Sequence, residues 1–95
     1  MNLYWHEDAR AEADDAAHFY KNIQPGLALR FLDSLDETLH RIQRHPELCR
    51  QVEGEIRKCR VPHFPYGVIY RSQAEFIEII AVMHLRRSPG YWKER

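Results

Sequence analysis

The sequence predicts an α+β fold in which a helix hairpin packs on one face of a small antiparallel sheet, in the order β-α-α-β-β-β. Two patterns carry this prediction. Apolar residues recur at helical spacing through residues 9–42, and after Gly54 they follow a period of two. The chain has 95 residues, of which 44% are apolar or aromatic and 29% are charged. That length and balance suit one core, so we expect a single domain over residues 1–95.

The first strand and the first helix occupy the acidic amino-terminal part of the chain. Residues 2–5 form a short apolar and aromatic run that is typical of a strand, and Glu7 and Asp8 suit the positive end of a helix dipole. One helical stripe of small and apolar residues follows: Ala9, Ala13, Ala16, Tyr20 and Ile23. Alanines at this spacing indicate close packing against another helix. The run Gln24-Pro25-Gly26 should break this helix.

A second amphipathic helix follows this break after a short link. Its apolar positions are spaced by three or four residues and include Ala28, Phe31, Leu32, Leu35, Leu39 and Ile42. The pattern ends near His45-Pro46. Because the link is short, the two helices should form an antiparallel hairpin. Residues 47–54 are polar and irregular, and we expect a loop there.

Three strands are predicted at residues 56–61, 66–71 and 76–84, separated by turns at 62–65 and 72–75. In the last strand we expect an apolar face toward the helices, formed by Ile77, Ile79, Ala81 and Met83. The mixed face, with Phe76, Glu78, Ile80, Val82 and His84, should look away from them. A basic and aromatic tail, residues 85–95, follows. The second face of the sheet is expected to be short of cover, and function is expected there.

The net charge is zero, with 14 Lys plus Arg and 14 Asp plus Glu, but the charges are separated along the chain. Residues 1–48 carry five bases and nine acids, whereas residues 49–95 carry nine bases and five acids. This asymmetry indicates a surface for an anionic partner in the second half. The zero sum excludes strong nonspecific binding of free nucleic acid and favours a target presented by a larger assembly.

The sequence argues against several other classes of protein. It has neither an apolar segment long enough to cross a membrane nor a secretory amino terminus, so we expect a cytoplasmic protein without membrane contact. Cys49 and Cys59 lie ten positions apart, which supports neither a disulfide framework nor a zinc site. The six histidines are scattered, and no phosphate-binding, dinucleotide or hydrolase motif occurs. We therefore expect no metal and no cofactor.

A group of cationic and aromatic residues remains as the candidate site: Arg57, Lys58, Arg60, Tyr70, Arg71, His84, Arg86, Arg87, Tyr91 and Trp92. Three interpretations of this group stay open. The residues can cleave phosphodiesters without a metal, with His84 and Tyr91 moving protons and cations holding the developing charge. They can grip an acidic peptide or a nucleic-acid backbone. They can also be a solvated sheet face, with Tyr91 and Trp92 closing the edge of the core.

Two runs in the carboxyl-terminal part resemble the RelE/ParE toxin superfamily of bacterial type II toxin–antitoxin modules, and most of all its ParE-like, plasmid-stabilisation branch. The first is Phe64-Pro65-Tyr66 with Tyr70-Arg71. The second is Ala81-Val82, His84, Arg86-Arg87, Pro89 and Tyr91-Trp92. The resemblance implies a growth-inhibiting toxin held in a hetero-oligomer by a cognate antitoxin, whose flexible segment wraps the helix hairpin and the sheet.

The resemblance leaves the target open, because RelE-type members cleave mRNA in the ribosomal A site without a metal and ParE-type members poison DNA gyrase. Lys58 and Arg60 match the basic pair of the nuclease type and Tyr91 its tail tyrosine, but Gly67 stands where that type has an arginine. We therefore favour a ParE-like toxin with a gyrase-type or undefined target, which would not be an enzyme. A ribosome-dependent mRNA endonuclease is the alternative, and a degenerate member that only binds its antitoxin is the third.

These alternatives assign different roles to the candidate residues. For a nuclease the catalytic set would be Lys58, Arg60, His84, Arg87 and Tyr91. Contacts with the target would be made by Arg57, Arg71, Arg86 and Trp92.

Overall fold

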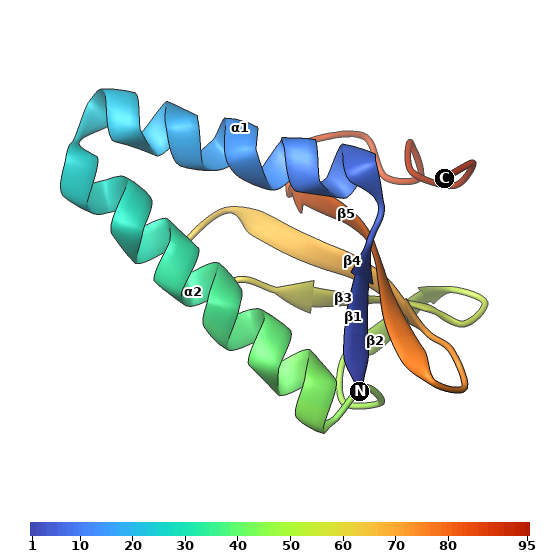
Figure 1. Ribbon diagram of the computed structural model, residues 1–95. Helices are drawn as coiled ribbons and strands as arrows, with labels where there is room; N and C mark the ends of the chain where they lie inside the picture. Colours follow the sequence, from blue (N-terminus) through green and yellow to red (C-terminus); the bar gives the residue numbers. More distant parts are fainter.

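Two helices cover one face of a five-stranded sheet, and the carboxyl-terminal tail lies along β5 near the start of α1 (Figure 1). The computed structural model describes residues 1–95. The elements in chain order are β1 (Asn2–Trp5), α1 (Glu7–Ile23), α2 (Pro25–Arg44), β2 (Arg50–Glu53), β3 (Ile56–Arg60), β4 (Tyr66–Ser72) and β5 (Phe76–His84). The sheet order is β1-β5-β4-β3-β2. The predicted fold class, a helix hairpin on one face of a small sheet, is confirmed.

The sheet is mixed rather than purely antiparallel, which corrects one part of the prediction. β1 pairs with β5 in parallel, with Leu3 opposite Ile77 and Trp5 opposite Ile79, while the other neighbours run antiparallel. The reason is topological. The chain leaves β1 through two helices and returns as the β2–β5 meander, so its last strand lies alongside its first in the same direction.

The predicted loop at residues 47–54 contains an additional strand, β2. It pairs with β3, with Arg50 opposite Lys58, and Gly54 makes the return turn at a φ of +54°. The same pairing places Cys49 beside Cys59, and the two form a disulfide with their Cα atoms 5.2 Å apart. The expectation of no disulfide framework is therefore wrong, because the spacing of the cysteines does not reveal the β2–β3 pairing that brings them together.

The helix boundaries follow local chemistry closely. His6 caps α1, its Nδ1 accepting a hydrogen bond from the backbone N–H of Asp8 at 3.1 Å. Pro25 does not lie in a loop but opens α2, where its missing N–H costs no helical hydrogen bond, and Gln24 alone separates the helices. Neither helix is long and apolar enough to cross a lipid bilayer.

A β-bulge in β5 divides the apolar residues differently from the simple alternation that the sequence predicts. Ile69 pairs with Ala81 and Tyr70 with Ile79, so Ile80 is an extra residue between two ladder positions. Beyond the bulge the faces exchange. Ile77, Ile79 and Val82 belong to the helix-side core, whereas Ala81 and Met83 lie on the opposite face. The predicted orientations of Ala81, Val82, Met83 and His84 are wrong for this reason.

The second face of the sheet was expected to be short of cover. It instead carries a small core of its own. Its five buried residues are Ile69, Ile80, Ala81, Met83 and Trp92. Trp92, with only 4% of its surface exposed, comes from the tail and covers the other four. We call this group the tail-side cluster, in contrast to the 17-residue core under the helices.

Candidate functional site

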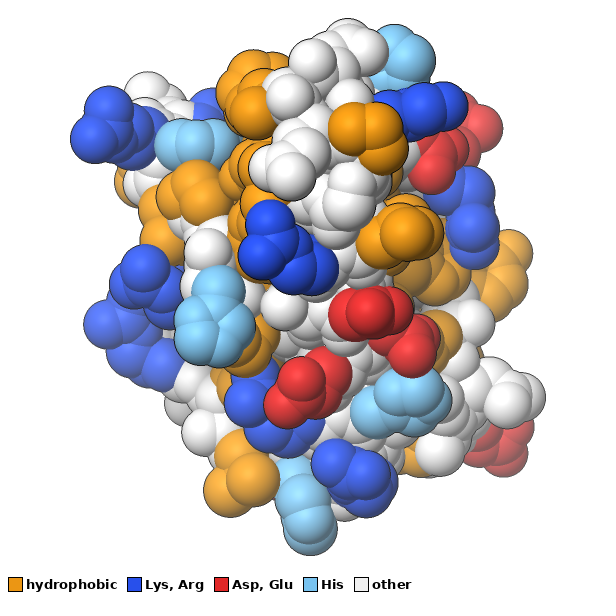
Figure 2. Space-filling model, turned by 90° about the vertical axis from the view of Figure 1, so that its left-hand side faces the viewer, with side chains coloured by type: hydrophobic (Ala, Val, Ile, Leu, Met, Phe, Trp, Pro, Cys, Tyr) orange, Lys and Arg blue, Asp and Glu red, His pale blue; other side chains and the backbone are white.

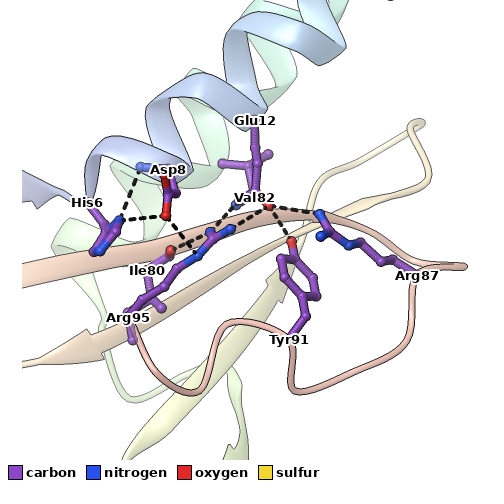
Figure 3. A network of polar contacts seen from close by, with 8 residues as sticks. All are labelled: His6, Asp8, Glu12, Ile80, Val82, Arg87, Tyr91 and Arg95. Carbon is purple, nitrogen blue, oxygen red and sulfur yellow. Dashed lines mark hydrogen bonds and ion pairs between the residues drawn. The ribbon is translucent and has the colours of Figure 1, made fainter.

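The edge of β5 is left open where β1 ends, and side chains complete it (Figure 3). β1 pairs with β5 only as far as Ile79. Beyond that point, the backbone N–H of Val82 donates to Oε1 of Glu12 at 3.0 Å, and Nη1 of Arg95 donates to the carbonyl of Ile80 at 3.1 Å. A carboxylate from α1 and a guanidinium from the tail thus replace the hydrogen bonds that a longer β1 would make.

Three tail residues converge on the same carboxylate, which is only 15% exposed. Arg95 donates to both oxygens of Glu12, at 2.8 and 3.2 Å, and the hydroxyl of Tyr91 donates to Oε2 at 2.6 Å. Arg87 reaches Oε2 at 3.3 Å, and its guanidinium carbon lies 3.5 Å from the centre of the Tyr91 ring. We call Glu12, Arg87, Tyr91 and Arg95 the Glu12 network. Its geometry attaches the tail to the first helix.

The electrostatics of this network keep Tyr91 protonated. Burial, followed by the hydrogen bond to Glu12 and its negative charge, raises the pKa of Tyr91 well above the ordinary range of a tyrosine. The hydrogen bond to Glu12 likewise raises the pKa of Arg95. Tyr91 is therefore a fixed hydrogen-bond donor, and it is not a proton acceptor at neutral pH.

The five residues predicted for a nuclease are divided between two faces of the sheet. Lys58 lines a hollow on the tail side, and the side chain of Arg60 is exposed without a hydrogen bond or ion pair. The ring of His84 packs against Tyr66, 5.1 Å away, and Tyr66 in turn packs against Phe31 under the helices. Nδ1 of His84 accepts from the backbone N–H of Arg86 at 3.1 Å.

The remaining two predicted catalytic residues, Arg87 and Tyr91, are held in the Glu12 network (Figure 3). His84 lines the same hollow as Glu12 and Arg87, so the structure gathers three of the five residues at this edge and leaves Lys58 and Arg60 on β3. Metal binding has no obvious place either, because the structure contains no group of three or more His, Cys, Asp or Glu side chains arranged for a metal ion.

Of the four residues predicted to contact a target, three make contacts within the protein. Nη1 of Arg57 donates to the carbonyls of Glu47 and Cys49, at 3.0 and 2.8 Å, which holds the loop before β2. Arg71 pairs with Glu78 at 2.8 Å across the β4–β5 ladder. Trp92 is buried. Arg86 alone is exposed with a side chain that makes no hydrogen bond or ion pair.

Sequence reasoning missed Glu12 and Arg95, the two residues that hold the tail. A signal for Glu12 was present, because it lies four positions after Asp8 and four before Ala16, within a stripe whose alanines at 9, 13 and 16 are buried. An acidic residue at the border of a buried stripe needs partners. For Arg95 the sequence carries no comparable signal, since its partners come from α1 and β5.

The hairpin carries a second exposed feature, two large apolar side chains on each of its helices. Phe19, Ile23, Leu29 and Leu32 have exposed fractions of 57%, 59%, 66% and 42%. Figure 2 views the molecule from the side of the hairpin tip and shows hydrophobic side chains in several patches between charged ones. Apolar surface of this kind is available for burial by a partner.

Comparison with known proteins agrees with this architecture. A family model described as the ParE toxin of a type II toxin-antitoxin system, parDE, matches residues 3–89. A solved structure of the chromosomal ParDE toxin-antitoxin system from P. aeruginosa is similar, with a TM-score of 0.80 and 21% identity, over 90% of this chain and 97% of that one. The comparison with curated proteins found no match. At this identity the structural likeness concerns the fold.

Proposed function

The chain belongs to the ParE toxin family of type II toxin–antitoxin systems, and we propose that it inhibits growth by binding a macromolecular target and is neutralised by a cognate antitoxin. The target that this proposal favours is of the DNA gyrase type. Action by binding requires neither a metal nor a cofactor, and it requires no arrangement of proton-transfer groups.

The state of Tyr91 is the observation that supports binding over cleavage. General acid–base catalysis needs its groups within hydrogen-bond reach of the same substrate atoms. Here the Tyr91 hydroxyl already donates to Glu12 at 2.6 Å, and its raised pKa disfavours the phenolate form that could accept a proton. His84 packs toward the helix side, away from Lys58. Lys58 and Arg60 on β3 are thus not part of the hollow that His84 and Arg87 line, which supports binding over cleavage.

The exposed apolar side chains of the helix hairpin support the antitoxin part of the proposal. Phe19 and Ile23 on α1 and Leu29 and Leu32 on α2 leave much of their apolar surface in water. Covering them with a partner would be favourable at about 25 cal/mol per Å². A hetero-oligomer in which the antitoxin covers the hairpin would stabilise the toxin and hold it away from its target.

Induction of the chain in bacterial cells without its partner tests the proposal. The wild type is compared with an Arg60→Ala, His84→Ala double variant, and folding of both is verified by circular dichroism. We expect both to stop growth, with DNA synthesis arrested, cells filamentous and mRNA intact. Cut ribosome-bound mRNA, together with loss of toxicity in the double variant, would establish the endonuclease alternative. A folded chain that leaves growth unaffected would be a member that only binds its antitoxin.

Arg86 is the most direct probe of target contact in the tail. Deletion of residues 86–95 is unsuitable, because it removes Trp92 and the three tail members of the Glu12 network and so disturbs folding. Arg86→Ala removes only an exposed, unpaired cation. We expect this variant to be less toxic while co-purification with the antitoxin persists. Unchanged toxicity would exclude Arg86 from the target contact.

A further inference from the structure

We propose that the hollow between β2 and the tail binds an acidic peptide segment with apolar side chains. The hollow has a volume of about 400 Å³ and is open at the surface of the tail-covered face. This inference goes beyond the proposed function, since it requires neither toxicity nor a particular target. It rests on the construction of the hollow, on its charge and on one unsatisfied hydrogen-bond donor.

The hollow is built from parts that come together only in the folded chain. Its floor is apolar and consists of Ile69, Met83 and Trp92 of the tail-side cluster. One wall is β2 and the other is the tail at Pro89. Lys93 of the tail pairs with Glu53 at the end of β2 at 3.3 Å, which ties the two walls together. The volume accommodates a few side chains.

The charges around the hollow select an anion. Arg50 and Lys58 line it, and neither side chain makes a hydrogen bond or ion pair within the protein. Its lining includes no Asp or Glu. Each of the four other main hollows of the surface contains at least one acidic residue, such as Asp33 or Glu12. Two unpaired cations above an apolar floor complement a carboxylate next to an apolar side chain.

The indole N–H of Trp92 independently supports a ligand in the hollow, because it has no hydrogen-bond acceptor in the protein. Its ring is 96% buried and lines the hollow, yet its indole N–H donates to no acceptor in the protein. Buried donors are almost always satisfied, and an unsatisfied one costs about 1–3 kcal/mol. A carbonyl or carboxylate oxygen of a bound segment would accept this hydrogen bond after a small shift of the tail.

Gly67 allows Lys58 to lie across the sheet. A Cβ atom at Gly67 would be 3.1 Å from Cε and 3.3 Å from Cγ of Lys58, closer than ordinary contact. The glycine therefore leaves room for the aliphatic part of the lysine. The nuclease type has an arginine at this position. In this chain, a side chain larger than that of Gly67 would displace the aliphatic part of Lys58.

A peptide fits these features better than a nucleic acid does. Single-stranded nucleic acids are held by a run of cations along the backbone and by aromatic faces exposed for base stacking. Here only two cations line the hollow, and the Trp92 ring is buried. An apolar floor of this kind contacts aliphatic side chains instead.

Binding of synthetic probes to the full-length protein tests the proposal. The probe is a blocked hexapeptide that alternates glutamate and leucine, and its glutamine–leucine counterpart and a uridine hexanucleotide are the comparison probes. We expect the acidic peptide to shift the NMR signal of the Trp92 indole N–H and to leave that of Trp5 unchanged. An Arg50→Gln, Lys58→Gln variant should bind about tenfold more weakly, because two charge-assisted contacts are lost. The matched control, Arg30→Gln with Arg44→Gln on α2, should bind like the wild type.

Three results would overturn the proposal: no binding of the acidic peptide to the folded wild type, equal binding of the glutamine peptide, or binding of the nucleotide alone. Equal affinity in the Arg50→Gln, Lys58→Gln variant would also place any peptide elsewhere. Since these measurements involve no cells, their failure would leave the growth-arrest experiment unaffected, and the reverse also holds.

Discussion

The two faces of the sheet are covered in different ways. On the helix side, 17 buried residues form one core, in which the rings of Tyr20, Phe31, Phe64 and Tyr66 pack at centroid distances of 5.0–6.3 Å. On the tail side, four buried sheet residues are covered by residues 85–95, which are attached through Trp92 and Glu12. Stability is therefore distributed over many contacts on one face and concentrated in a few on the other.

The largest effect is expected from a substitution in the helix-side core. Phe31 is fully buried and contacts three other aromatic rings. Phe31→Ala should lower the free energy of unfolding by about 4 kcal/mol, through lost burial and a cavity, which is a large part of the stability of a small domain. Denaturant titration measures this loss. Leu29→Ala, an exposed site on the same helix, should change stability by less than about 0.5 kcal/mol.

Removal of the carboxylate at the centre of the Glu12 network should have a slightly smaller and more local effect. Glu12→Ala leaves the Tyr91 hydroxyl and the Val82 N–H without their acceptor, and Arg95 keeps only the Ile80 carbonyl and Asp8 as partners. We expect a loss of about 3 kcal/mol, because partly buried polar groups are left unpaired. Hydrogen exchange at Val82 should accelerate, whereas Glu37→Ala on the surface of α2 should leave it unchanged. Unaltered exchange in Glu12→Ala would contradict a role of Glu12 in completing the sheet edge.

Tyr91→Phe should show a small effect that depends on pH. At neutral pH the variant loses one hydrogen bond to Glu12, at a cost of about 1 kcal/mol. Because the folded-state pKa of Tyr91 is raised above its ordinary value of about 10, the unfolded chain releases the phenol proton first as pH rises. This contribution to wild-type stability is complete below pH 10 and declines above it. The difference between wild type and variant should therefore narrow in denaturant titrations above pH 10, and a constant difference would refute the pKa shift.

The smallest effect on stability, with a separate effect on binding, is expected from Gly67→Ala. The new Cβ would meet the flexible end of Lys58 rather than backbone, so stability should change by less than about 0.5 kcal/mol. Displacement of Lys58 should weaken binding of the acidic peptide. Gly26→Ala, where a Cβ meets no atom within 4 Å, is the matched control and should bind normally. Equal affinity in both variants would show that the position of Lys58 is unimportant.

The regular elements could be predicted because their side chains repeat with the right period. The strand at 76–84 is found with both boundaries, and the second helix is found through its spacing of apolar residues. β2 was missed since Arg50–Glu53 is a fully exposed edge strand with one apolar residue, Val52, and no alternation. A strand of this kind is defined by its partner, β3, rather than by its own sequence.

The candidate site was predicted only in part, because it depends on contacts between distant segments. The tail was correctly identified as basic and aromatic, but nothing local indicates that Tyr91 and Arg95 meet Glu12, 79 and 83 positions away. The bulge at Ile80 likewise comes from the pairing of β4 with β5. The bulge turns Ala81 and Met83 to the tail side, where they belong to the tail-side cluster with Trp92.

The sequence by itself determined the order of helices and strands apart from β2, the separation of acidic and basic halves and the resemblance to the toxin superfamily. These are properties of composition, of period and of short motifs, and all of them are local. Tertiary structure alone decided which cations are free, which face each β5 residue occupies and where the tail is attached. The physical reason is that a side chain is neutralised, buried or exposed by neighbours that lie as far as 83 positions away in the sequence, and those neighbours are specified only when the sheet has its register.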